Sequence, residues 1–139
     1  MANQTQDREP SRQEGLQLAL KATNVKFFRG ALAMFDATTG FVVKAADAAG
    51  GVLAGVVTGQ KDLSALAAGA GRVELYRKGV FEFTYGPGGA TDALVGDVVH
   101  VLDDQTVTTP AASANDVVAG SIVEVVSATK VRVEIKTGA

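Results

Sequence analysis

The chain has 139 residues, of which 47% are hydrophobic, and a formal net charge of −2 at pH 7. That length suits one compact domain, which would bury roughly 65–70% of its unfolded surface. The chain has no cysteine and a single histidine, which excludes disulfides and thiolate metal sites. Lys and Arg form no cluster, and no run of about 18 apolar residues occurs, so we expect neither nucleic acid nor a membrane as partner.

Residues 1–15 differ in character from the rest of the chain. They are mostly polar or charged, include Arg8 and Arg12, and contain few large apolar side chains. Such a segment cannot bury enough surface to offset the entropy lost on ordering. It also lacks the apolar stretch of a signal peptide. We therefore predict a flexible N-terminal arm over 1–15 and a folded domain over 16–139.

Short alternating runs through the folded part predict strands. Leu16, Leu18 and Leu20 alternate with Gln17 and Ala19, which predicts a first strand with one apolar face. Residues 52–57 are almost continuously apolar, as is typical of a strand covered on both faces. Further strands are predicted at 25–28, 31–36, 41–47, 72–85, 97–103, 106–109, 121–126 and 130–136. The fold class is therefore all-β.

One long run, residues 72–85, changes its alternation at Gly79. A glycine inserted in a strand is typical of a bulge or a barrel corner, so we predict a strand bent at Gly79 within a small β-barrel. Pro87 and its neighbouring glycines should end that strand. Residues 36–40 carry the Asp, Thr and Gly of a hairpin turn. Residues 61–69 fit either a short helical turn or a loop.

Two parts of the sequence follow a similar order. Residues 32–57 read as a strand, an Asp-led turn, a strand, a spacer and an Ala-Gly strand, and residues 99–126 repeat that order. Asp36 precedes Gly55 by nineteen positions, and Asp103 precedes Gly120 by seventeen. Two half-barrels built on one motif would explain this order. The alternative is that short β-strands resemble one another by composition alone.

The search for catalytic chemistry finds no complete set of residues. His100 lies in an alternating run, as expected of a sheet residue, and no serine has the G-x-S-x-G setting of a nucleophile. Asp103 and Asp104 fit a hairpin turn better than a calcium loop. The glycine clusters lack the helix and the G-K-[ST] of a phosphate loop. We expect no enzymatic activity, cofactor, metal or small-molecule substrate; the alternative is an enzyme or ligand-binding barrel with His100 and Asp97 at one rim.

Four segments of the sequence resemble the capsid cement or head-decoration proteins of tailed bacteriophages, including the lambda-type decoration protein. The clearest similarity is in "LYRKGVFEF" at 75–83, which follows the "GVLAGVV" strand at 51–57. The resemblance covers about residues 30–136. It implies a small β-barrel or β-tulip domain that forms a homo-trimer or related oligomer on the outer surface of an expanded capsid.

This resemblance implies a structural virion protein, made in the host cytoplasm, whose partner is the major capsid protein. N-terminal arms in such families often reach onto neighbouring coat subunits. Strand addition would use backbone hydrogen bonds for affinity and alternate side chains for register, and an oligomer would multiply the contacts. The alternative is a structural β-barrel module of a phage tail or fibre. The residues expected to contact the capsid are Arg8, Arg12, Leu16, Leu18 and Leu20.

Overall fold

The computed structural model describes residues 17–137, which form an all-β fold of twelve strands with two short 3-10 helices. The predicted fold class is confirmed. The elements are β1 (Gln17–Ala22), β2 (Lys26–Phe27), β3 (Leu32–Phe35), β4 (Val42–Lys44), β5 (Val52–Val57), β6 (Lys61–Asp62), β7 (Gly71–Tyr76), β8 (Val80–Tyr85), η1 (Asp92–Leu94), β9 (Val98–Val101), β10 (Thr106–Thr108), η2 (Pro110–Ala112), β11 (Val118–Ser127) and β12 (Lys130–Ile135).

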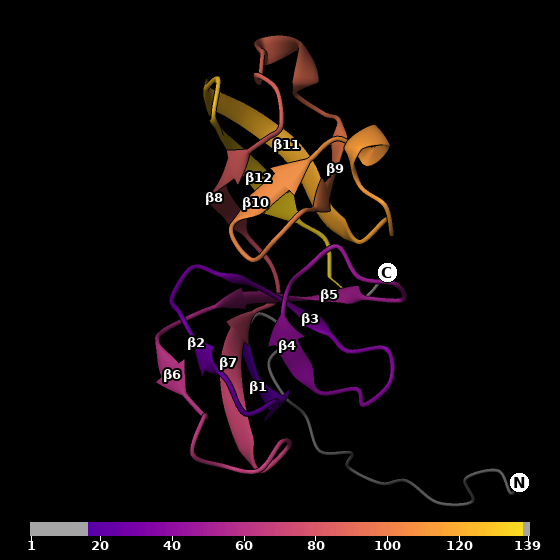
Figure 1. Cartoon of the computed structure of the whole chain (residues 1–139). Helices are drawn as coiled ribbons and strands as arrows, with labels where there is room; N and C mark the ends of the chain where they lie inside the picture. Colours follow the sequence, from indigo (N-terminus) through magenta and orange to yellow (C-terminus); the bar gives the residue numbers. More distant parts are fainter. Residues whose placement is uncertain (1–16, 138–139) are drawn as a thin grey trace, which may run out of the picture.

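The strands close into two barrels rather than the single barrel that we expected. The N-terminal barrel has the order β1-β4-β3-β5-β7, and the C-terminal barrel has the order β10-β8-β12-β11-β9. Strands β2 and β6 form a separate two-stranded sheet. Figure 1 shows the C-terminal barrel stacked on the N-terminal one, with the chain passing once from β7 to β8.

The two barrels have the same strand pairing. In the N-terminal barrel β1 is parallel to β4 and antiparallel to β7, and β3 pairs with both β4 and β5. In the C-terminal barrel β8 is likewise parallel to β10 and antiparallel to β12, and β9 pairs with both β10 and β11. The repeat predicted from the sequence is thus present in the topology. Two half-barrels were the wrong interpretation, because each copy of the motif lies in a closed barrel of its own, which β1 and β7 complete in one case and β8 and β12 in the other.

Gly55 and Gly120 occupy equivalent positions in these barrels. Gly55 pairs with Ala33 and Gly120 with Val99, and the register shifts beside each glycine. Their φ angles are 153° and 155°, and a Cβ at either site would collide with a backbone carbonyl of the neighbouring strand. Only glycine fits, and the bulge it allows bends the strand so that a five-stranded sheet can close.

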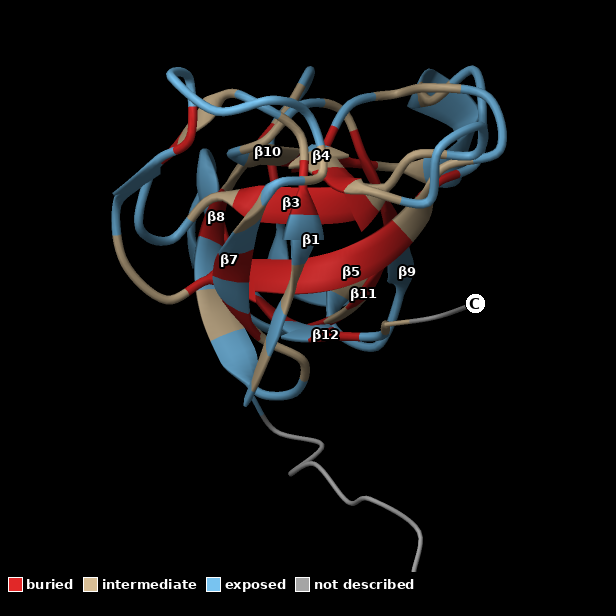
Figure 2. Ribbon diagram, turned by 90° about the horizontal axis from the view of Figure 1, so that it is seen from below, coloured by how far each residue is buried: buried red, intermediate tan, exposed pale blue. Residues whose placement is uncertain are grey.

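Strand β5 is covered on both faces, as predicted. Ala54 and Val57 lie in the interior cluster of the N-terminal barrel, whereas Leu53 and Val56 belong to the cluster that continues into the C-terminal barrel. The bulge at Gly55 changes the alternation between these pairs. Figure 2 shows β3 and β5 as neighbouring buried bands. The outer face of these two strands therefore packs against the second barrel.

Gly79 lies between two strands and not within one. Strand β7 ends at Tyr76 and β8 begins at Val80, and each belongs to a different barrel. The predicted bulge at Gly79 is therefore wrong: the alternation changes there because the chain crosses from one barrel to the next. Gly79 has a φ of 132°, and its carbonyl accepts a hydrogen bond from the Ile135 N–H at 3.1 Å.

Candidate functional site

Of the residues expected to contact a capsid, Arg8, Arg12 and Leu16 lie outside the described residues. Leu18 and Leu20 lie on β1 and are half-buried. Leu18 pairs with Leu75, and Leu20 packs against the interior cluster of the N-terminal barrel. Leu20 therefore contributes to the barrel core, and Leu18 lies on the same face of β1.

Among residues 17–137, strand β1 is unpaired along most of one edge. It pairs with β7 from Gln17 to Ala22 but with β4 only at Ala22. The Glu74 carbonyl accepts from the Thr58 N–H at 3.1 Å, so the backbone of Glu74 faces β5. Its cross-strand partner Ala19 must then point its N–H and C=O away from β7.

Within residues 17–137 no strand pairs with this edge between Gln17 and Lys21. The Ala19 carbonyl accepts a side-chain hydrogen bond from Arg72 Nη1 at 3.1 Å. An edge with unpaired backbone groups is a template for strand addition. We define the open edge of β1 as the backbone of residues 17–21 on the side away from β7.

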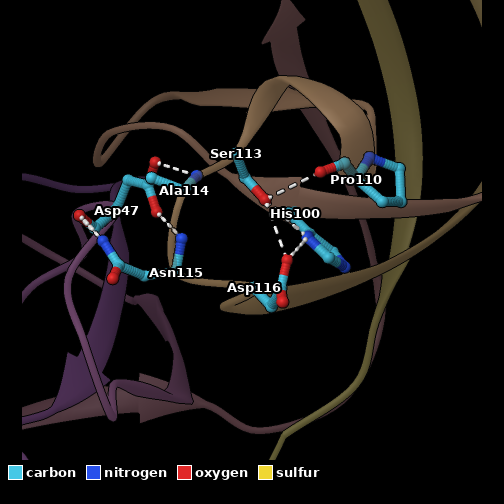
Figure 3. A network of polar contacts seen from close by, with 7 residues as sticks. All are labelled: Asp47, His100, Pro110, Ser113, Ala114, Asn115 and Asp116. Carbon is cyan, nitrogen blue, oxygen red and sulfur yellow. Dashed lines mark hydrogen bonds and ion pairs between the residues drawn. The ribbon is translucent and has the colours of Figure 1, made fainter.

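His100, the first candidate for catalysis, takes part in a network that fixes the loop between β10 and β11 (Figure 3). It is only 7% exposed, and its Nδ1 lies 2.8 Å from Ser113 Oγ and 3.6 Å from Asp116 Oδ1. Ser113 Oγ also donates to the Pro110 carbonyl at 3.2 Å. In a catalytic triad the serine and the carboxylate use opposite ring nitrogens. Here both lie at the same nitrogen, so the group is not a triad.

Asp47 joins this loop to the other barrel. It lies between β4 and β5, and its two carboxylate oxygens accept the backbone N–H groups of Ala114 and Asn115, each at 2.8 Å (Figure 3). Asn115 Nδ2 returns a hydrogen bond to the Asp47 carbonyl at 2.9 Å. The N–H of Ala114 is the largest cause that lowers the pKa of Asp47. Burial, the second-largest effect, raises this pKa, and Asn115 and then nearby His100 lower it further.

Sequence reasoning missed Asp47 altogether. The residue stands in an Ala-rich stretch with no motif around it, and its partners are 67 and 68 positions away in the chain. Only the packing of the two barrels brings them together. The role of this contact is to connect the barrels, since a carboxylate that accepts two backbone N–H groups satisfies donors that a loop would otherwise leave unpaired.

Asp97, the second candidate, lies apart from the His100 network. It lines a pocket of about 410 Å³ in the C-terminal barrel, together with Leu94, Val98, Pro110 and other mainly apolar residues. His100 does not line this pocket, so the two residues do not form one rim site. The part of the chain that the structure describes holds no cluster of three or more metal-ligating side chains. That part also has no helix long and apolar enough to cross a membrane.

Comparisons with known protein families, with curated proteins and with solved structures find no match to this chain. The function of this chain is therefore inferred from its own geometry and from the sequence resemblance. Two features of that geometry bear on function. They are the open edge of β1, and a His100 network whose arrangement fits a structural role rather than catalysis.

Proposed function

We propose that this chain is a structural virion protein that binds the outer surface of a phage capsid and stabilises neighbouring coat subunits. The observation that carries the proposal is the open edge of β1, which follows directly on the N-terminal segment in the sequence. A coat-protein strand that pairs with this edge would satisfy its backbone groups, and backbone pairing supplies affinity without a deep pocket. The two fused barrels give the edge a folded support.

The partner in this proposal is the major capsid protein, reached after synthesis in the host cytoplasm. A homo-trimer or related oligomer would place several N-terminal segments and β1 edges on one capsid, and each bound edge would raise the effective concentration of the next. The proposal requires no enzymatic activity, cofactor, nucleic acid, membrane or small-molecule substrate.

The first test is binding of the purified protein to undecorated, expanded capsids of tailed phages. We expect saturable binding by the full-length chain and survival of the particles to a higher temperature. A variant lacking residues 1–15 should bind on the order of 100-fold more weakly, because each subunit of the oligomer would lose the capsid contacts of its N-terminal segment. If the full-length protein binds no capsid, the capsid role is wrong, and a module of a phage tail or fibre becomes the better proposal.

A matched pair of variants tests the edge itself. Ala19→Pro removes the N–H that points away from β7, whereas Ala19→Ser keeps it. Ala19→Ser should bind capsids like the unchanged protein, and Ala19→Pro should bind more weakly while its circular dichroism stays all-β. Equal binding by the two variants would contradict strand addition at β1. His100→Ala should leave capsid binding unchanged, whereas a ligand-binding or enzymatic barrel would lose its activity.

A further inference from the structure

An exposed aromatic side chain lies among cations at the end of β2. Phe28 is 48% exposed, although its neighbour Phe27 is only 1% exposed in the barrel core. The Nζ atoms of Lys26 and Lys44 lie 5.4 and 5.6 Å from the centre of the Phe28 ring, within the range of a cation–π contact. Arg29 follows directly in the chain. We define the Phe28 patch as Lys26, Phe28, Arg29 and Lys44.

The backbone holds this aromatic residue in place. The Ala31 N–H donates to the Phe28 carbonyl at 3.2 Å, and the Gly30 N–H donates to the Val57 carbonyl at 2.9 Å. Gly30 has a φ of 82°, a conformation that glycine adopts without strain. The turn is thus tied to β5 without use of the Phe28 side chain. A partner that bound the ring would have little chain entropy to remove from this side of the interface.

The cations of the patch are available for pairing. Within residues 17–137 none of the three has a carboxylate oxygen within the 4.0 Å of an ion pair. Asp62 lies opposite Lys26 in the β2–β6 sheet, and its carboxylate accepts the N–H and the hydroxyl of Ser64 at 3.0 and 2.6 Å. The pKa of Asp62 is lowered mainly by Ser64 and least by the charge of Lys26, so the attraction between Asp62 and Lys26 is weak. Asp104 is the one acidic residue that lines the hollow of about 260 Å³ beside Phe28 and Arg29.

We propose that the Phe28 patch binds an acidic protein segment in which carboxylates flank an apolar side chain. The ring supplies an apolar contact, and the cations near it pair with the carboxylates. Aromatic and Arg side chains are enriched in the energetically important parts of protein interfaces. Nucleic acid fits less well, because single strands need several stacking platforms and the patch has one ring, on a chain of net charge −2. This surface is independent of the proposed capsid function.

The test is an NMR titration of the ¹⁵N-labelled full-length protein with the peptide Glu-Glu-Leu-Glu-Glu. Titrations with Gln-Gln-Leu-Gln-Gln and with a thymidine decamer run in parallel. We expect the acidic peptide to shift the amides of residues 28–31 and to bind more weakly as salt is added. Lys44→Glu should weaken this binding about tenfold, and Phe28→Ala several-fold. Both side chains are exposed, so both variants should keep the melting temperature of the unchanged protein.

Two matched controls lie in the other barrel. Val80 is as exposed as Phe28, at 48%, and Lys130 is an exposed cation, so Val80→Ala and Lys130→Glu should leave the peptide affinity unchanged. The proposal is overturned if the uncharged peptide binds equally well, if Lys130→Glu weakens binding as much as Lys44→Glu, or if the shifts avoid residues 28–31. Tighter binding of the thymidine decamer would also overturn it. Since no capsid is used, a negative result leaves the proposed function untouched.

Discussion

The two barrels share one strand pairing, but equivalent positions on their outer faces hold different side chains. The pairs Ala33–Gly55 and Val99–Gly120 set the equivalence. In the N-terminal barrel the outward positions of β3 and β5 are all apolar and buried, and the second barrel covers them. They are Leu32, Met34, Leu53 and Val56, and their equivalents in the C-terminal barrel are Val98, His100, Val118 and Ser121.

This difference distinguishes residues that strand pairing requires from residues that suit the surroundings of each face. Both barrels keep the bulge glycine, because the close approach of the neighbouring carbonyl leaves no room for a Cβ in either. The outer face of the C-terminal barrel has a loop and solvent around it, so it holds a histidine and a serine where the N-terminal barrel has methionine and valine. The two barrels have the same backbone arrangement, whereas the kind of side chain at each outward position depends on what that face contacts.

The largest effect should come from breaking the feature that the barrels share. Gly55→Val and Gly120→Val each add a side chain that collides with the neighbouring strand and strains the backbone. In each variant these two effects should lower the free energy of unfolding by on the order of 4 kcal/mol. Urea unfolding should show a similar loss for both variants, or no folded protein. If one variant is as stable as the unchanged chain, the two glycines are not structurally equivalent.

The next-largest effect on stability should come from the difference between the outer faces of the two barrels. Leu32→Ala opens a cavity between the barrels and should cost about 3 kcal/mol, because Leu32 is fully buried there. Val98 stands at the equivalent position and is 45% exposed, so Val98→Ala should change stability by less than about 1 kcal/mol. The measurement compares the midpoints of urea unfolding of these two variants. Equal losses would mean that the C-terminal face is covered as well.

The smallest effect concerns the contact that joins the barrels. The pKa of Asp47 in the folded chain lies below its ordinary 3.8, mainly because of the Ala114 N–H. The stabilisation it contributes is therefore present above about pH 3.8 and is lost as the pH falls through the lower folded pKa. Asp47→Asn should flatten the acid side of the stability profile and speed amide exchange at Ala114 or Asn115.

Asp36→Asn is the matched control for this prediction. The pKa of Asp36 is also lowered, by Thr39, but its carboxylate binds only within its own turn. This variant should likewise flatten the profile below pH 4 and leave exchange at Ala114 and Asn115 unchanged. If Asp47→Asn leaves both the profile and the exchange unchanged, the carboxylate does not connect the barrels in solution.

Much of the local structure could be predicted from the sequence. The alternation over 130–136 predicted the buried Val131, Val133 and Ile135 of β12, and the Asp-led turn at 36–40 forms as expected. The repeat was visible through Asp36, Gly55 and their counterparts. The predicted bulge failed at Gly79 for a physical reason: a change of alternation looks the same whether a strand bends or a chain leaves one barrel for the next.

The candidate site was less accessible from sequence. The strand at 17–22 was predicted, but which of its edges stays open depends on how far β4 extends beside it, and β4 pairs with it at one residue. Leu20, one of the leucines predicted to contact a partner, packs against the core of the barrel, and the capsid contact of Leu18 and Leu20 stays a prediction. Alternation identifies an apolar face, and only the assembled barrel shows what that face covers.

By itself, the sequence determined the all-β class, most strands, the turns and the repeated Ala-Gly motif, because these depend on residues that are neighbours in the chain. Only the tertiary structure decided that each motif lies in a closed barrel of its own, that Asp47 binds the backbone 67 and 68 positions away, and that Lys44 joins Lys26 beside Phe28. Such contacts join segments that are far apart in the chain, so no local sequence pattern indicates them. They exist because burial of two apolar faces brings those segments together.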